Sequence, residues 1–467
     1  MNRRQFLKLG GLFCLSLSTP FCFREKEAMA AAIANIDYIP PTTIPQIINI
    51  FLYGGPSELA GNLTNIADIH ANSQNPYPSS IVPDNGGGDI TPNYFWGQAG
   101  GTIMEELLNS NGASTPQMSV YRTINRIKDD SKAHGRSVTQ NLLGNLDLLN
   151  PGIATTLAAI LEMHNPFGRD INELVFPFVT FEGESTIFNL GDHDIPLVFR
   201  PMSLDSGFKN PYERSKNSYI DGADEDTNDN RLDSLAQSVS SARFANKKVY
   251  QAFLKRAELA EFISSQFNDD AIEADLPVDP DTNAQIQYPN SNFGNRLKAA
   301  VSLAVKNPDT IFISLGSGGL GGWDDHSGAL DNYPSRMNGL MEALQVAARH
   351  MELKDANNIV INVFGDFGRN VNLNLSKGWD HGNNQNFYTV GGSAIPGRTL
   401  GKLVGRTRRI GTPFQNRQFT SPTDDSYQCE PFAIASTIFK YFGVQNPEIL
   451  TGEPPINESA DVPNELV

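Results

Sequence analysis

Two short segments bring carboxylates and imidazoles together. Asp324 and His326 lie in GGWDDHSG, and Asp366 and His381 lie at either end of DFGRNVNLNLSKGWDH. Carboxylate and imidazole groups together suit a divalent metal such as zinc or manganese. Because Asp324 and His326 are two residues apart, an extended chain points both to the same side, where they reach one ion. The same residue types also cap and hydrogen-bond loops, so loop capping remains the alternative interpretation of the spacing.

Apolar runs before these segments predict the strands that position them. The runs are QIINIFLY at 46–53, TIFISLG at 310–316 and NIVINVFG at 358–365. Such near-continuous apolar runs are typical of buried parallel strands, and the intervening SRMNGLMEALQVAARHMEL has the apolar stripe of a helix. A strand–helix–strand unit in one sheet implies a right-handed parallel crossover. Ligands bind at the carboxyl ends of such strands, so we expect the four side chains within about 6 Å of a common point.

The glycine-rich segment GSGGLGGWDDHSG at 316–328 also matches a dinucleotide fingerprint. That motif needs a helix that begins within the glycine loop, so that its N-terminus faces pyrophosphate. Here Trp323 and Asp324 follow the glycines instead, and the helical pattern begins only near Asn332. The segment therefore does not predict a nucleotide site.

The alternation of strands and helices predicts the fold class. We expect an α/β fold with a doubly wound, mostly parallel sheet sandwiched by helices, forming one domain over residues 31–467. PFAIASTIFKYFG at 431–443 predicts a late amphipathic helix. The long helical pattern at 241–267 indicates an inserted, mostly helical lobe around 205–290.

The N-terminus is typical of a twin-arginine export signal. Arg3 and Arg4 precede Gln-Phe-Leu-Lys, a short apolar region follows, and Ala28 and Ala30 form a small-x-small cleavage site. We expect residues 1–30 to be recognised by the twin-arginine export machinery and removed, which predicts a periplasmic or secreted protein. An uncleaved membrane anchor is the alternative.

The charge of the chain limits the classes of partner that it can bind, and its cysteine count limits the disulfides that it can form. The chain has a formal net charge of −16, and residues 1–30 carry five basic and two acidic side chains, so the remainder is near −19. Such an acidic chain argues against nucleic acid as a partner. No later segment is long and apolar enough to cross a bilayer, so no integral membrane segment is expected after cleavage. Cys429 alone remains in the mature chain, which excludes an intramolecular disulfide.

The order of FLYGGPS, GGWDDHSG, GDFGR and GWDHG resembles the bacterial DUF1501 proteins, an exported family. KAHGRSVTQNLLGN at 132–145 resembles a further family segment, with His134 at its histidine position. The family is identified by similarity as part of the alkaline phosphatase and sulfatase superfamily. The resemblance therefore implies an alkaline-phosphatase-like fold, divalent metals at the carboxyl edge of the sheet, and hydrolysis or transfer of phosphate or sulfate esters.

The resemblance also implies roles for single residues. Asp324 and His326 would form one part of the metal site, with zinc, manganese or calcium as the expected cofactor. Asp366 stands at the aspartate of an Asp-His pair, and His381 resembles a late histidine ligand.

Two further residues belong to the expected ester chemistry. Ser57, in the turn after the first strand, takes the position of the nucleophile, and Arg369 would bind the oxyanion as a bidentate donor. A serine after Gly-Gly-Pro also caps turns, so both interpretations of Ser57 stay open.

The sequence departs from the superfamily at two positions. Phe367 stands where an active phosphatase has a histidine, and Glu58 lies in the region where the family has an aspartate. Two functions therefore remain open. One is an exported metal-dependent hydrolase of a small anionic ester, and the other is a non-catalytic envelope protein for binding or assembly with a degenerate metal site.

Overall fold

A computed structural model describes residues 29–109, 115–129, 131–191, 193–204, 267, 269–414, 418–423 and 427–466, with positions 234 and 238. The expected export signal and most of the expected lobe around 205–290 lie outside the described residues. Of that lobe, the structure describes a short helix and a small hairpin, which are α8 (Asp269–Asp275), β5 (Val278–Asp279) and β6 (Ala284–Gln285).

The described chain forms a mostly parallel sheet of eight strands in the order β10-β2-β9-β8-β1-β7-β3-β4. Among these strands only β9 runs antiparallel to its neighbours. The strands are β1 (Gln46–Leu52), β2 (Met118–Asn125), β3 (Phe178–Thr180), β4 (Met202–Ser203), β7 (Phe312–Gly316), β8 (Ile359–Gly365), β9 (Asn384–Gly391) and β10 (Leu403–Val404). A separate hairpin pairs β11 (Thr407–Ile410) with β12 (Phe419–Pro422). The predicted α/β class with a large, mostly parallel sheet is confirmed.

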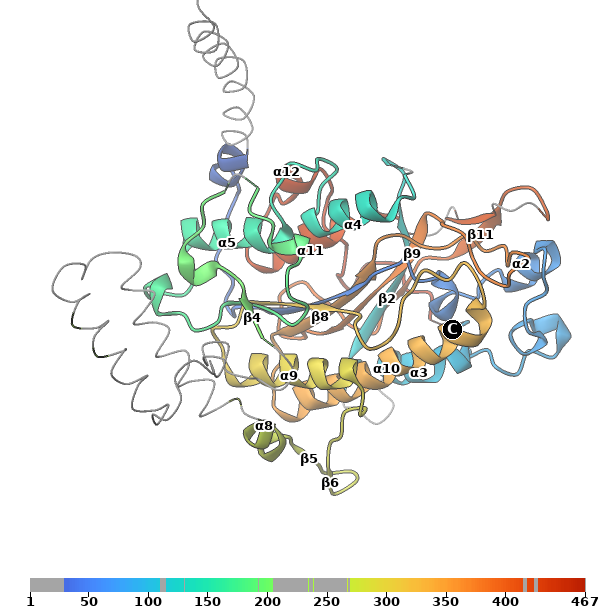
Figure 1. Ribbon diagram of the computed structural model, residues 1–467, viewed down its shortest axis with the longest axis horizontal. Helices are drawn as coiled ribbons and strands as arrows, with labels where there is room; N and C mark the ends of the chain where they lie inside the picture. The colour runs from blue at the N-terminus through green and yellow to red at the C-terminus, as the bar shows by residue number, and fades with distance from the viewer. Residues whose placement is uncertain are drawn as a thin grey trace, which may run out of the picture.

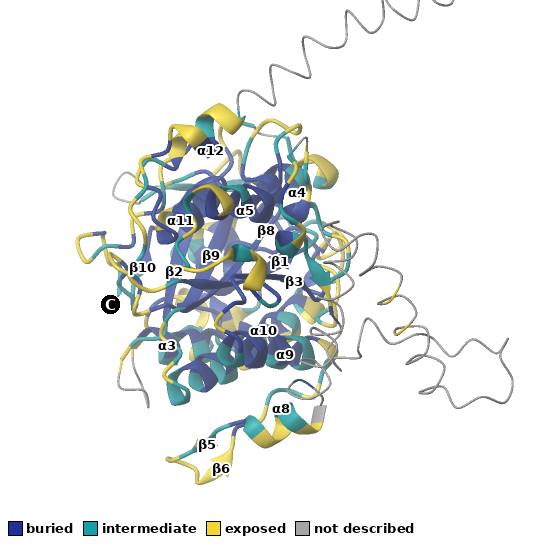
Figure 2. Cartoon of the chain, turned by 90° about the vertical axis from the view of Figure 1, so that its left-hand side faces the viewer, coloured by how far each residue is buried: buried dark blue, intermediate teal, exposed yellow. Residues whose placement is uncertain are grey.

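Helices cover both faces of this sheet (Figure 1). One layer contains α4 (His134–Leu143), α5 (Ile153–His164), α11 (Ala433–Tyr441) and α12 (Glu448–Thr451). The opposite layer contains α3 (Gly101–Asn109), α9 (Asn292–Lys306) and α10 (Ala329–Leu353). The short helix α2 (Ile66–Asn72) lies at the end of the molecule next to β11. In Figure 2 the sheet between the layers is almost entirely buried, so the sheet has an apolar core on each face.

Strand β1 occupies the centre of the fold. It pairs in parallel with β7 on one side and with β8 on the other, and all seven of its residues are buried. Ile48 and Ile50 pack into the core beneath α9 and α10, whereas Ile47 and Phe51 pack into the opposite core. Burial on both faces explains why β1 reads as a continuous apolar run. The predicted strand–helix–strand unit of β7, α10 and β8 therefore spans the central strand.

No helix among the described residues combines the length and the apolar character needed to cross a bilayer. The predicted absence of a further membrane segment is consistent with this observation.

Candidate metal centre

Two glycines make room for the site where β1 ends. Gly54 and Gly55 have φ angles of 114° and 73°, in a region that favours glycine. A Cβ atom on Gly54 would lie 2.7 Å from the backbone nitrogen of Asp324, and one on Gly55 would lie 2.8 Å from the ring of Phe367. The turn after β1 therefore passes directly beneath the loops that follow β7 and β8.

Four potential ligands come together at this carboxyl edge. Their ligand atoms all lie within 4.8 Å of one another, and they come from three loops: His134 begins α4 after β2, Asp324 and His326 lie between β7 and α10, and His381 lies between β8 and β9. β2, β7 and β8 run in the same direction, so their carboxyl ends meet at one edge of the sheet. The topology thus explains how residues far apart in sequence become neighbours.

Four distances within the group are close to those between the ligands of a tetrahedral metal site. Asp324 Oδ1 lies 3.2 Å from His134 Nε2, 3.0 Å from His326 Nε2 and 3.6 Å from His381 Nε2. The Nε2 atoms of His326 and His381 are 3.0 Å apart. Zinc–ligand bonds of about 2.0–2.1 Å give a regular tetrahedron with edges of about 3.3–3.4 Å. These four separations are close to the edges of such a tetrahedron, and the other two, from His134 to His326 and to His381, are within 4.8 Å.

Asp366 lies behind the group and contacts one of its members. Its carboxylate is fully buried, and its Oδ2 atom is 2.6 Å from His134 Nδ1. This hydrogen bond raises the pKa of His134, partly offset by burial, and it turns His134 Nε2 towards Asp324. Asp366 was predicted as a direct ligand. In the structure it contacts His134 Nδ1, as carboxylates do that orient a histidine in known metal sites.

The other two histidines are held in the same manner. His326 Nδ1 is 3.0 Å from Asp380 Oδ1, and His381 Nδ1 is 2.5 Å from the carbonyl oxygen of Lys132. Burial lowers the pKa of His381, which favours the neutral imidazole that metals bind. In all three rings Nδ1 therefore contacts an oxygen atom of the protein, and Nε2 points towards Asp324.

Arg369 lies beneath the group and joins its loops. Its side chain is fully buried and donates a hydrogen bond to Asp324 Oδ1 at 2.6 Å. The guanidinium also donates to backbone carbonyls on three segments: Nε to Gly55, Nη1 to Trp379, and Nη2, which binds Asp324 as well, to Gly54 and Trp323. Burial acts to raise the pKa of Asp324, but the hydrogen bond and charge of Arg369, with the nearby histidines, lower it overall. Arg369 was predicted to bind an oxyanion. In the structure its guanidinium binds Asp324 and the backbone of three loops.

Ser57 begins the short 3₁₀ helix Glu58–Gly61, and its Oγ atom accepts a hydrogen bond from the backbone N–H of Leu59 at 3.3 Å. This contact is the turn cap that was one of the two interpretations of Ser57. Glu58 is fully buried and accepts hydrogen bonds from Asn384 and Thr420. Its carboxylate faces the core and does not belong to the four-residue group.

Phe367 forms one apolar wall of the group. Its ring centroid lies 4.7 Å from those of both His134 and His381. The other side is open, because the side chains of Asp324 and His326 are 48% and 45% exposed. The four ligand atoms are therefore packed against an aromatic ring and remain accessible to solvent.

His134 is the group member that the spacing argument missed. It follows β2, whose sequence MSVYRTIN includes a buried arginine and lacks the apolar run of β1 or β8. The family resemblance marked its position, but only the topology brings it beside Asp324.

The comparison with known families agrees with the motifs. A family model described as "Protein of unknown function (DUF1501)" matches residues 45–424, so the chain belongs to this family. No curated protein matches the sequence.

Proposed function

We propose that this member of the DUF1501 family is an exported, metal-dependent hydrolase of phosphate or sulfate esters. One divalent cation would bind to His134, Asp324, His326 and His381. The observation that carries this proposal is the shared orientation of the three imidazoles, each with Nδ1 fixed by the protein and Nε2 directed at one carboxylate oxygen.

The donor set favours zinc among the expected cations. Three imidazole nitrogens and one carboxylate oxygen at tetrahedral spacing suit zinc, and imidazole ligation also suits other transition metals. Calcium prefers six to eight oxygen ligands, and three of the four donors here are nitrogen. One cation rather than two fits the group, because Asp366 is occupied by His134 and Phe367 offers no ligand.

The position of the group supports ester chemistry. It lies at the carboxyl edge of a doubly wound sheet, where α/β proteins bind their ligands. A bound cation would supply a Lewis acid for the ester oxygens and lower the pKa of a coordinated water. The protein orients the ligands through Asp366, Asp380 and Arg369 and leaves one side of the group open. The position of the group at the carboxyl edge of a mostly parallel sheet also supports the proposal of an alkaline-phosphatase-like fold.

Ser57 is the proposed nucleophile, and its role is to be tested by substitution. Its Oγ atom accepts from Leu59 N, and a serine that acts only as this cap can be replaced without loss of turnover. Export by the twin-arginine pathway to the periplasm or beyond is proposed on the sequence of residues 1–30.

A non-catalytic binding or assembly protein is the second candidate. It is favoured by Phe367, which packs against His134 at the position where the resemblance to the phosphatases implies a histidine ligand, and by the cap geometry of Ser57. Such a protein would use the cation to fix its loops.

Turnover of aryl phosphates and aryl sulfates by the zinc-loaded protein separates the two candidates. The hydrolase proposal expects release of the phenol, lost in His326→Ala. Loss in Ser57→Ala as well would identify Ser57 as the nucleophile, and full activity there would leave Ser57 as a cap. Zinc binding with no turnover of either ester class would favour the non-catalytic protein.

A further inference from the structure

Asp324 differs from the three histidines in its hydrogen-bond partner. Each histidine presents Nδ1 to a carboxylate or carbonyl oxygen, and such acceptors make an imidazole a stronger ligand. Asp324 presents Oδ1 to a cation, the Arg369 guanidinium, at 2.6 Å. The same Oδ1 atom faces the three imidazoles. A positive charge on a carboxylate oxygen stabilises its lone pairs and weakens its bond to a second cation.

Arg369 is the fixed partner of this pair. Its side chain is fully buried, and its guanidinium also donates to the carbonyls of Gly54, Gly55, Trp323 and Trp379. Asp324 is 48% exposed and is the movable partner. A rotation of its carboxylate would take Oδ1 away from the imidazoles, and the exposed side of Asp324 leaves space for it.

We propose that Asp324 is an exchangeable ligand: the three histidines retain the cation, and an oxygen of a tetrahedral phosphate or sulfate group takes the place of the Asp324 carboxylate. The exchange replaces one anionic oxygen ligand by another, so the cation keeps an anionic oxygen in its fourth position. It also converts four protein ligands into three with one open position, which is the usual difference between structural and catalytic zinc sites. This inference rests on the proposed cation site and adds how the substrate reaches it.

Zinc affinity provides the first test, measured by calorimetry on the metal-free protein. Asp324→Asn preserves the shape of the side chain and an acceptor for Arg369, and we expect zinc affinity within about tenfold of the wild type. His326→Ala removes a fixed ligand, and we expect a loss greater than about 100-fold, above the range typical of changes to residues that only hydrogen-bond a ligand. Equal losses in the two variants would overturn the exchangeable ligand.

Phosphate titration of the cobalt-loaded protein provides a second test that does not depend on activity. The visible absorption of cobalt reports its ligand number and geometry. We expect inorganic phosphate to change this spectrum in the wild type, and Asp324→Asn to reach half of the change at a severalfold lower phosphate concentration. A spectrum that phosphate leaves unchanged would also overturn the proposal.

The outcomes distinguish this inference from the function on which it rests. A wild-type protein that binds neither zinc nor cobalt contradicts the proposed cation site itself. A wild-type protein that binds both, with Asp324→Asn as damaging as His326→Ala, contradicts only the exchange of Asp324.

Discussion

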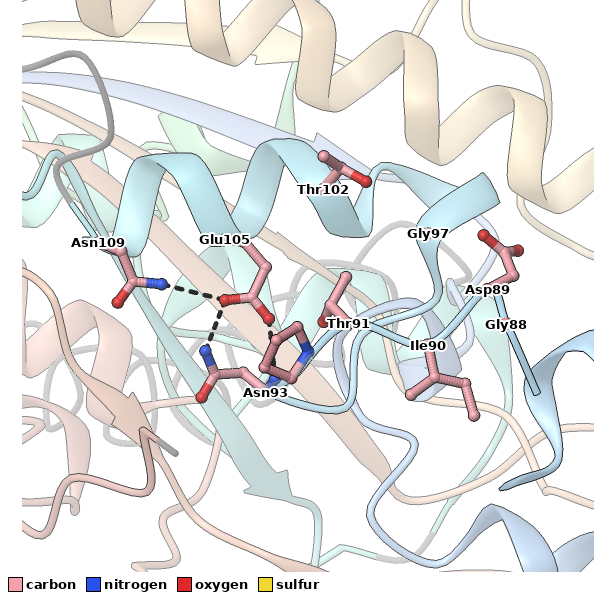
Figure 3. Close-up of a pocket in the computed structure, with 10 residues that line it drawn as sticks. Gly88, Asp89, Ile90, Thr91, Asn93, Gly97, Thr102, Glu105 and Asn109 are labelled. Atoms are coloured by element: carbon pink, nitrogen blue, oxygen red, sulfur yellow. Dashed lines mark hydrogen bonds between the residues drawn. The ribbon is translucent and has the colours of Figure 1, made fainter. Parts of the chain in front are cut away.

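Two polar regions of this protein use their side chains in opposite ways. The pocket between α3 and the loop before it has a volume of about 640 Å³ and is lined by Asp89, Asn93, Glu105 and Asn109 among others (Figure 3). Glu105 accepts hydrogen bonds there from the backbone and side chain of Asn93 and from Asn109. Every one of these partners belongs to the pocket itself, so its polar groups hold the loop in place.

The group at the carboxyl edge has a different pattern. Its histidines satisfy Nδ1 with the protein, yet their Nε2 atoms face one another and Asp324 at 3.0–3.6 Å. Two imidazole nitrogens that face each other can share only one proton between them, whereas one cation satisfies all of these atoms. The hydrogen-bond partners of each polar atom, rather than the size of the cavity, therefore separate a ligand site from a structural one.

Of the changes considered, removing one histidine should have the largest effect on zinc affinity. We expect His381→Ala to reduce zinc affinity more than about 100-fold, because losing a fixed imidazole ligand costs more than losing the carboxylate that orients such a ligand. Glu105→Ala is the matched control and should leave zinc affinity unchanged. Calorimetric titration of both variants is the measurement, and equal zinc affinity in His381→Ala and the wild type would show that this histidine is no ligand.

Replacing the buried partner of His134 should have a smaller effect with a distinct pH signature. Asp366→Asn is expected to reduce zinc affinity about 10–100-fold at neutral pH. Because the hydrogen bond from Asp366 raises the pKa of His134, the variant should lower that pKa. Protons would then compete with zinc only at lower pH, so the decline of affinity on acidification should begin at a lower pH than in the wild type. An unshifted decline would show that His134 does not bind the cation.

Glu58 extends the comparison to a carboxylate buried in the core. Burial raises its pKa to about 7, although hydrogen bonds from Thr420 and Asn384 act in the opposite direction. A raised pKa in the folded state means that its contribution to stability is fully present below about pH 4.5 and is lost as pH rises through about 7.

We therefore expect Glu58→Gln, which carries no charge, to exceed the wild type in unfolding free energy by about 1–2 kcal/mol at pH 8. The difference should shrink towards pH 5. Denaturant unfolding between pH 5 and 8 is the test. A wild-type protein that becomes more stable relative to the variant across this range would contradict the raised pKa of Glu58.

The Glu105 pocket should give the smallest effect. Glu105→Gln removes the charge but keeps one acceptor for Asn93 and Asn109, so we expect a loss of about 1 kcal/mol in unfolding free energy. Thermal unfolding measures the loss. A fall in zinc affinity in this variant would remove the distinction between the two regions.

Local sequence patterns predicted the elements that position the site. The apolar runs of β1, β7 and β8 were sufficient because each of these strands is buried on both faces. β9 was not foreseen as the antiparallel neighbour of β8, because its sequence NQNFYTVG places polar side chains at buried positions, such as Asn384, whose Nδ2 donates to the carbonyl oxygen of Arg122.

The candidate site was only partly visible in the sequence. Asp324, His326 and His381 follow predicted strands, and they meet as the spacing suggested. His134, which the spacing did not predict, joins the group because a helix start after β2 brings this histidine from a distant segment, and the buried Asp366 contacts the group through His134. The position of Arg369 beneath three loops depends on the tertiary arrangement and has no local signal.

X-ray absorption at the zinc edge of the zinc-loaded protein tests the central claim most directly, because imidazole rings have a recognisable scattering pattern. The account predicts one tightly held zinc per chain with three imidazole nitrogens at about 2.0–2.1 Å and the remaining ligand an oxygen. A first shell of oxygen atoms without imidazole, or no zinc retained after desalting, would contradict it.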